Sequence, residues 1–308
     1  MTVPTSELGY VNGRGTDWQQ WDEDERVPEL QWPQSVHTYS RMLREDGRVS
    51  SLLQAIGLPI RRTTWRIDQA GARDEVTEFV AQNMGLAIAG ADEPTSTRLK
   101  GRFSWSTHVQ QALLMLRYGH QFFEQKVRIV GEGKAMRAHL HKLAPRPSPT
   151  ISKINVARDG GLVSIVQSPA VDSGLTVARM LAGGDEIPVS RLVAYVRDPD
   201  PGDWVGRSLL RPAYKHWLLK DEFMKIQAVG ARRTAIGVPD YVNPPGATQD
   251  DIKAGQKLAS RYRGGETSGL SRPYGSEFKL QGVQGTLPDI QRWIEYQDKQ
   301  IALAGLAH

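Results

Sequence analysis

The sequence of 308 residues predicts an α+β protein, with a body of helices followed by antiparallel strands and two long helices that flank a small α/β insertion. Three observations lead to this prediction. Apolar residues recur at helical spacing up to Tyr118, alternating segments joined by glycine-rich turns follow up to about residue 200, and two longer amphipathic segments flank residues 235–285. The length suffices for two or three domains with a buried core.

Composition narrows the class of protein. Cysteine is absent, which excludes disulfides, thiolate metal sites and cysteine nucleophiles. No segment approaches 18 consecutive apolar residues, and the N-terminus lacks a basic start before an apolar core, so the sequence predicts neither secretion nor a membrane partner. The 39 Lys and Arg against 34 Asp and Glu give a net charge of +5, which suits a protein close to nucleic acid and equally an ordinary soluble surface.

The N-terminal third predicts an arm and three helices. Residues 1–36 mix Gly, Pro and acids with Trp18, Trp21 and Trp32, which favours an arm laid over a partner surface or folded onto its own domain. The helices are expected over residues 37–56 with a break near Asp46, over 73–86 and over 106–118, and a strand over 63–68. Gly119 is the expected stop of the third helix.

Strands dominate the next segment. Residues 120–130 and 134–145 alternate around GEG and predict a hairpin, and residues 151–158 and 162–169 predict another around Asp159. Residues 186–196 predict one further strand. Together with the preceding helices, these strands make residues 37–203 one α+β domain with an antiparallel sheet.

A long helix is predicted over residues 204–234, with Ser208 as its cap and Pro212 in its first turn. At 100° per residue, four basic residues fall within about 40° of one line together with Glu222, namely Arg211, Lys215, Lys225 and Arg233. The opposite side carries an apolar stripe that must be covered by protein: Leu209, Ala213, Trp217, Met224 and Ala231. Leu219, Phe223 and Ile226 lie between the two stripes, so this helix needs neighbours on more than one side.

A second long helix is predicted over residues 286–308, capped by Thr286 with Asp289 three residues on. Its apolar face consists of Ile290, Trp293, Ile294, Ile301 and Ala304. The insertion at 235–285 carries turn signals, one short helix over 248–262 and strand-like segments at 234–242 and 276–283. It therefore predicts a compact α/β unit between the two helices.

The sequence motifs that could indicate catalysis or metal binding are incomplete. The GEGK sequence at 131–134 lacks the glycine and the hydroxyl residue that a phosphate loop requires. His139 and His141 share a strand face without a third ligand, and the aspartates of DPDPGD, residues 198–203, are typical of turns. We expect no catalytic residue, no metal site and no cofactor.

The order of these elements resembles the portal proteins of tailed double-stranded DNA bacteriophages, and most of all those of long-tailed phages of actinobacteria. The loop that opens the long helix carries the resemblance through Gly202, Gly206, Ser208, Leu209, Leu210, Arg211, Pro212, Ala213, Tyr214 and Trp217. Residues 42–67 and 112–124 support it, in the same order.

The resemblance implies a ring, usually of twelve subunits, at one capsid vertex, with a tunnel for DNA packaging and ejection and a site for head-tail attachment. It implies a wing at 37–203, stem helices at 204–234 and 286–308, and a clip at 235–285. It further implies double-stranded DNA, the major capsid protein, a terminase and a head-tail adaptor as partners, and location in the virion after assembly in the host cytoplasm. Family members continue into a C-terminal crown, whereas this sequence ends at IALAGLAH. We expect either a truncated or partly ordered version of a longer protein, with the crown absent from this sequence, or a resemblance that does not extend to the C-terminal end.

Within that family, three cations of the long helix become candidates to approach DNA in the tunnel, unless they pair with acids of the next subunit. They are Lys215, Lys225 and Arg233. The stem would pack through Leu209, Ala213, Trp217, Met224, Ile290, Trp293, Ile294 and Ile301. In the clip, Lys253, Lys257, Arg261 and Arg263 are candidates to dock a motor or adaptor, or form a solvated helix face. Two competing functions are another head-tail connector component and a nucleic-acid-processing enzyme. The enzyme would require an acidic metal cluster or a nucleotide loop, and the sequence shows neither.

Overall fold

The computed structural model describes residues 11, 25–91, 103–133, 136–168, 184–262, 272, 274–281 and 289–306. The chain divides into two compact units, the first comprising residues 1–214 and 301–308 and the second residues 215–300. The predicted mixture of helices and antiparallel strands is confirmed. None of the described helices is both long and apolar enough to cross a membrane.

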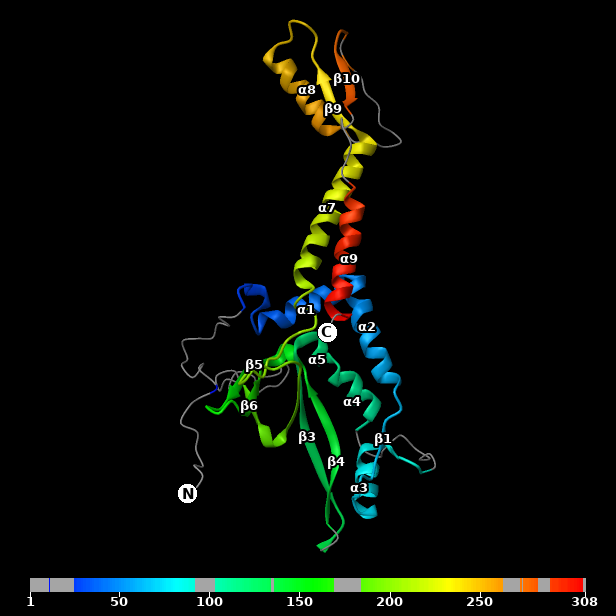
Figure 1. Cartoon of the computed structure of the whole chain (residues 1–308). Coiled ribbons are helices and arrows are strands. Elements are labelled where there is room, and N and C mark those ends of the chain that lie inside the picture. The colour runs from blue at the N-terminus through cyan, green and yellow to red at the C-terminus, as the bar shows by residue number, and fades with distance from the viewer. Residues whose placement is uncertain are drawn as a thin grey trace. The chain divides into compact units, whose positions relative to one another are not determined.

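Helices of the first unit lie close to their predicted positions (Figure 1). They are η1 (Pro28–Leu30), α1 (Gln34–Glu45), α2 (Gly47–Arg62), α3 (Asp74–Met84), α4 (Trp105–Ala112) and α5 (Leu114–Tyr118). The break between α1 and α2 falls where it was predicted, because the Asp46 carboxylate accepts hydrogen bonds from the amides of Arg48 at 2.7 Å and Val49 at 3.3 Å. The helix predicted over 106–118 is divided by a turn at Leu113, and the strand predicted over 63–68 is the short β1 (Arg66–Ile67), parallel to β2 (Ala87–Ile88).

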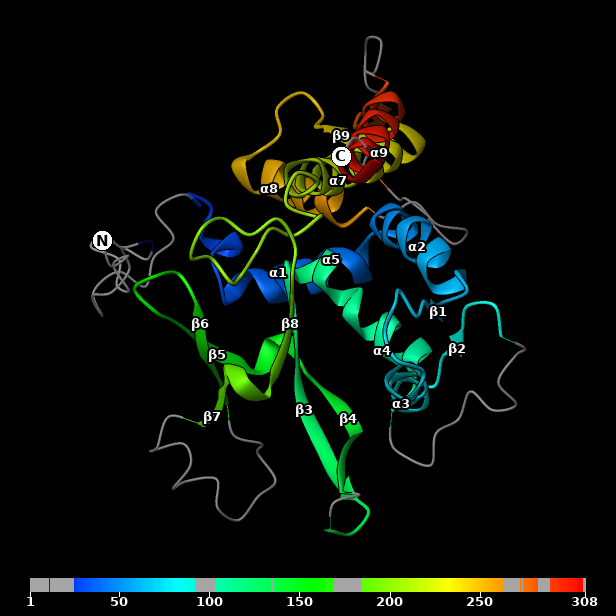
Figure 2. The same ribbon diagram turned by 60° about the horizontal axis from the view of Figure 1, so that its bottom comes forward.

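Two three-stranded antiparallel sheets follow, where the sequence predicted one (Figure 2). The first has the order β4-β3-β8, from β3 (His120–Val130), β4 (Arg137–Arg146) and β8 (Leu192–Val196). The second has the order β5-β6-β7, from β5 (Ile151–Val156), β6 (Leu162–Gln167) and β7 (Asp185–Pro188). The single strand predicted over 186–196 was wrong, because β7 ends at Pro188, a residue without an amide donor, and the turn η4 (Val189–Arg191) leads the chain into the other sheet.

A buried cluster forms the core beside the second sheet. It consists of Phe122 from β3 with Ile151, Leu162, Ile165 and Ile187. Trp32 and Trp204 pack against this cluster, so the part of the predicted arm that contains Trp32 lies on its own domain. Trp18 and Trp21 lie outside the described residues.

The second unit contains the greater part of two long helices and a small α/β insertion between them (Figure 1). Its elements are α7 (Tyr214–Ile236), β9 (Val238–Val242), α8 (Gln249–Arg261), β10 (Glu277–Gln281) and α9 (Ile290–Leu306). β9 and β10 pair antiparallel, and α8 begins with a capping box between Thr248 and Asp251. These elements match the insertion that the sequence predicted.

Three boundaries in this region differ from the prediction. α7 begins at Tyr214 rather than after Ser208, so Pro212 precedes the helix, and it continues through Ile236 into the segment predicted as a strand. α9 begins at Ile290, where the Asp289 carboxylate accepts a hydrogen bond from the Arg292 amide at 3.2 Å. The predicted cap Thr286 lies outside the described residues.

Candidate functional site

The loop that leads into α7 belongs to the first unit and is fastened to α5 by hydrogen bonds. The Leu209 amide donates to the carbonyl of Leu116 at 2.9 Å, at the end of α5. The Ser208 hydroxyl donates to the carbonyl of Arg117 at 2.6 Å and accepts from the Leu210 amide at 3.0 Å. Ser208 therefore stabilises a turn before α7 instead of capping the helix, and it ties that turn to a residue 91 positions earlier.

A buried histidine holds the same loop from the other side. The His120 imidazole is fully buried, and its Nδ1 donates to the carbonyl of Val205 at 2.8 Å. Burial lowers the pKa of His120 to about 4, so the ring is neutral at pH 7. Next to it, Gly119 and Gly206 have φ values of +91° and +67° and touch through their backbones. These contacts leave no room for a side chain at either glycine.

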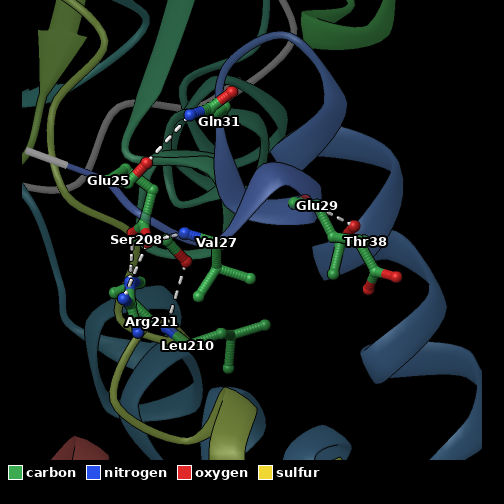
Figure 3. Close-up of polar contacts among 8 residues, drawn as sticks. All are labelled: Glu25, Val27, Glu29, Gln31, Thr38, Ser208, Leu210 and Arg211. Carbon is green, nitrogen blue, oxygen red and sulfur yellow. Dashed lines mark hydrogen bonds and ion pairs between the residues drawn. The ribbon is translucent and has the colours of Figure 1, made fainter. Parts of the chain in front are cut away.

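An acidic strap, which we define as residues 25–31, crosses the end of this loop (Figure 3). The Glu25 carboxylate accepts a hydrogen bond from Nη2 of Arg211 at 2.9 Å and a second one from its Nε. The same carboxylate accepts from the Val27 amide at 3.0 Å, and the Gln31 amide nitrogen donates to the Glu25 carbonyl at 2.9 Å. Arg211 was predicted to lie in the basic stripe of the helix, but it precedes α7 and pairs within its own chain.

A second carboxylate of the strap holds the first residue of α7. The Tyr214 hydroxyl donates to Glu29 at 2.6 Å, and the Thr38 hydroxyl donates to the Glu29 carbonyl at 2.8 Å. Burial and the neighbouring Glu29 raise the pKa of Tyr214 to about 12, so the phenol keeps its proton. The strap thus fixes the point from which α7 starts.

Within the second unit, four described side-chain pairs join α7 and α9, and three of them are polar. His216 Nδ1 donates to Gln297 Oε1 at 2.7 Å, and Lys220 Nζ lies 2.6 Å from Asp298 Oδ1. Gln227 donates to Gln291 at 3.1 Å. The one aromatic pair of the described seam is Phe223 and Trp293, stacked at 6.2 Å between ring centroids. We define these four pairs as the polar seam.

Sequence reasoning missed this seam because it looked for an apolar stripe. On α7 the contacting positions are 216, 220, 223 and 227, which fall on one face at helical spacing. That spacing was visible in the sequence, but a histidine, a lysine and a glutamine beside one phenylalanine do not indicate a helix interface. Of the apolar stripe, Leu209 and Ala213 lie before α7 and are buried, Trp217 is buried, and Met224 is 51% exposed.

The remaining predicted packing residues lie on α9. Ile294 and Ile301 are buried and Ile290 is partly buried, whereas Trp293 is 54% exposed in spite of its stacking on Phe223. A single chain therefore leaves both Met224 and Trp293 uncovered.

The face of α7 that points away from α9 carries the predicted basic residues and exposed apolar residues together. At 100° per residue, Leu218, Val229, Lys215 and Lys225 fall within an arc of about 80°, opposite the polar seam. Leu218 and Val229 are 40% and 48% exposed. Lys225 pairs with Asp221 at 2.6 Å, and Arg233 lies in α7 at a position whose side chain is not described.

Further apolar side chains are exposed on both long helices: Leu219 and Ile226 on α7, and Tyr296 and Leu303 on α9. Two helices with this much exposed apolar surface need another protein surface against them.

In the insertion, α8 directs its cations away from β9. Gly255 lies against the ring of Tyr241 on β9, which places the opposite face of the helix in solvent. Lys253, Lys257 and Arg261 share that exposed face, and Lys253 lies 3.9 Å from Asp250. Arg263 lies outside the described residues.

The residues rejected as metal ligands have other roles. His139 packs against the ring of Phe79, and Asp203 accepts a hydrogen bond from the Val205 amide at 2.8 Å within its turn. Asp198 and Asp200 pair with Arg197 and Arg207. In the described part of the chain, no group of three or more His, Asp or Glu side chains could hold a metal ion.

Comparison with known proteins gives one family and several structural neighbours. The sequence model of the family described as "Portal protein of Mu bacteriophage" matches residues 36–308. Among solved structures, the chain is similar to a chain from the neck of an empty gene transfer agent particle, computed with C6 symmetry. That match has 11% identity and a TM-score of 0.53, and covers 89% of this chain and 69% of the other.

Two further structures are similar. A chain from the neck of the native gene transfer agent particle, computed with C12 symmetry, matches with 10% identity and a TM-score of 0.51, over 88% of this chain and 68% of the other. An HK97 family phage portal protein from Corynebacterium diphtheriae matches with 11% identity and a TM-score of 0.46, over 87% of this chain and 75% of the other. At these identities, the first two likenesses establish a shared fold.

Proposed function

The chain belongs to the family of phage portal proteins, and we propose that it forms a ring around a channel through which double-stranded DNA is packaged and ejected. The ring would stand at one vertex of the capsid and attach the head to the tail. Two necks whose chains share this fold were computed with C6 and C12 symmetry, which supports a ring of twelve subunits. The role is structural, and the energy for packaging would come from a separate terminase.

The observation that carries this proposal is the exposed apolar surface of the two long helices. α7 and α9 contact each other through a polar seam, and several apolar side chains of both helices stay exposed and are left for other neighbours. In a closed ring, each subunit presents one face to the preceding subunit and another face to the next. Leu219, Ile226, Tyr296 and Leu303 would be buried in such contacts and would stabilise the ring.

Introducing charge into that surface should prevent assembly. The double variant Leu219→Asp/Ile226→Asp places two carboxylates where we propose an interface, so the ring is expected to dissociate to monomers that keep their helical content. Native mass spectrometry measures the mass of the particle, and circular dichroism measures the fold. The control is Val163→Asp, at a residue of β6 that is 46% exposed, and this variant should assemble normally. Rings of unchanged mass in the double variant would contradict the proposed interface.

Within this ring, we propose that Lys215, Lys225 and Arg233 approach the DNA. A channel that passes DNA needs sequence-independent and weak phosphate contacts, because strong neutralisation would hold the DNA in place. A thin line of cations on α7 meets that need, and Asp221 beside Lys225 moderates its charge. The alternative role for the three cations is ion pairing with acids of the next subunit.

Replacing all three cations with glutamine distinguishes the two roles. If they approach DNA, Lys215→Gln/Lys225→Gln/Arg233→Gln should still give rings of normal mass, while genome packaging or retention changes measurably. The readouts are native mass spectrometry of the ring and a nuclease-protection assay of packaged DNA. Failure of this variant to form rings would assign the cations to subunit contacts instead.

The other partners follow from the same proposal. Residues 37–203 would form the wing, 204–234 and 286–308 the stem, and 235–285 the clip, preceded by an arm at 1–36. The exposed cations of α8 would dock the terminase or the head-tail adaptor, Arg263 would extend this docking surface, and the wing would contact the major capsid protein. Assembly would take place in the host cytoplasm before the ring becomes part of the virion. We further propose a long-tailed actinobacteriophage as its source.

A further inference from the structure

Strand β3 continues well beyond the strand that pairs with it on one side. β8 pairs with residues from His120 to Glu124 only, whereas β4 pairs with β3 along its length to Val130. Residues 125–130 therefore form a two-stranded ribbon with β4, visible as the long hairpin of Figure 1. In the part of the chain that the structure describes, no strand pairs with the other edge of residues 125–130. We define this edge as the open β3 edge.

Side chains along the open β3 edge alternate between apolar and basic. Val127 and Ile129 are 53% and 62% exposed on one face of the ribbon. Lys126 and Arg128 are exposed on the other face, where Lys126 lies directly opposite Lys142 of β4. Like charges directly opposite each other destabilise a strand pair, and within the described residues none of these three cations has an ion-pair partner. The basic face therefore favours an acidic neighbour.

A shallow hollow marks the point where β8 leaves β3. It has a volume of about 440 Å³ and is lined by Gln125, Lys126, Val127, Ser190 and Arg191. It arises because η4 directs the chain away from β3 immediately before β8 begins. Arg191 contacts the Glu124 carboxylate, which Arg146 contacts as well, so one carboxylate faces two guanidinium groups. The hollow thus has an excess of positive charge.

We propose that the open β3 edge binds an extended segment of a partner protein in which acidic and apolar residues alternate. The segment would add a strand beside residues 125–130, in line with β8, and its end would enter the hollow. Main-chain hydrogen bonds would supply affinity, acidic side chains would lie against Lys126 and Arg128, and apolar side chains against Val127 and Ile129. This inference depends on the hairpin alone and not on the ring.

The arrangement of the side chains favours a peptide over a membrane or a nucleic acid. Cations and apolar residues lie on opposite faces of the ribbon, so a lipid surface could not contact both at once. A nucleic acid would use the basic face and leave Val127 and Ile129 exposed. A strand added at the edge reaches both faces.

The test uses the full chain and a fluorescently labelled peptide of sequence Ser-Glu-Val-Glu-Val-Glu-Ser, with binding measured by fluorescence anisotropy. Saturable binding is expected, with at least a tenfold loss of affinity in the double variant K126E/R128E. That variant should instead bind the peptide in which lysine replaces glutamate. The control variant K153E, at an exposed position of β5, should bind the first peptide as the unmodified chain does.

Two further probes make the outcome decisive. A peptide with alternate backbone amides methylated keeps its side chains but cannot pair as a strand, and it should lose binding. Equal binding of the methylated peptide would overturn strand addition. Absence of saturable peptide binding to the unmodified chain would overturn the proposal. The proposal would also be overturned if the chain bound a duplex DNA oligonucleotide through Lys126 and Arg128 and did not bind the peptide.

Discussion

Replacing Gly206 with alanine is expected to lower the free energy of unfolding of the first unit by about 3 kcal/mol or more. An alanine Cβ at this position would lie 2.6 Å from the carbonyl oxygen of Gly119 and 2.7 Å from that of Arg197. Both are backbone atoms, which cannot rotate away as a side chain could. The φ of +67° adds the strain of a left-handed conformation, which costs about 1–2 kcal/mol for a residue with a Cβ.

A matched glycine separates the steric contact from the conformational strain. Gly90 has a φ of +79°, and a Cβ there would meet nothing within 4 Å. Gly90→Ala should therefore cost only the conformational term, about 1 kcal/mol. Hydrogen exchange over residues 120–124, followed by mass spectrometry, reports the opening of β3 beside the contact. Equal protection in the two variants would show that the Gly119 and Gly206 contact does not hold this loop.

The same contact shows what a sequence can and cannot reveal. Gly119 was predicted to end a helix, and it does end α5 with a positive φ. This role is local, because a left-handed C-terminal residue is a property of one turn of chain. Its contact with Gly206, 87 residues later, requires the fold, and nothing in either glycine's neighbours indicates it.

Other elements were likewise predictable where a residue acts on its sequence neighbours, and were missed where distant parts of the chain decide the structure. The break near Asp46 and the helix beginning near Thr248 were predicted from the sequence, and at both places the structure has a capping side chain that acts within three residues. The glycine-rich turns predicted two hairpins for the same reason. The division of residues 186–196 between two sheets was missed because the choice of sheet depends on the surfaces that each strand can cover.

The candidate site was only partly visible in the sequence. Lys253, Lys257 and Arg261 were predicted as docking candidates or as a solvated helix face, and in the structure they share an exposed face of α8. Arg211 matched the spacing of the basic stripe, but the spacing has no meaning before the helix begins, and its partner Glu25 lies 186 residues away in sequence. The three polar pairs of the seam were missed because their residues are of types that usually face water.

The largest effect expected in the second unit comes from that seam. Asp298→Asn should lower the free energy of unfolding of this unit by about 2–3 kcal/mol. The Lys220 side chain is 13% exposed and the Asp298 side chain 36%, so the pair is shielded from water on the lysine side. Removing the carboxylate takes the charge of Asp298 away from a nearly buried ammonium group. Urea unfolding followed by hydrogen exchange of residues 290–300 measures the loss.

A surface pair on the same helix provides the control. Lys225 and Asp221 are 65% and 57% exposed, so Asp221→Asn should change stability by less than about 0.5 kcal/mol. If the two aspartate variants lose equal stability, the shielding of Lys220 has no energetic consequence.

The double variant Lys220→Met/Asp298→Leu determines why the seam is polar. Apolar side chains of similar size avoid the cost of burying charge, so this variant should recover most of the stability that Asp298→Asn loses. If it is as stable as the original chain, the ion pair contributes little net stability, and its role must lie in fixing which residues of α7 and α9 face each other. Polar pairs at defined positions specify such a register more strictly than apolar contacts do. Register in turn decides whether Leu219 and Ile226 point toward the next subunit, so a stable double variant that no longer forms uniform rings would assign the seam to assembly.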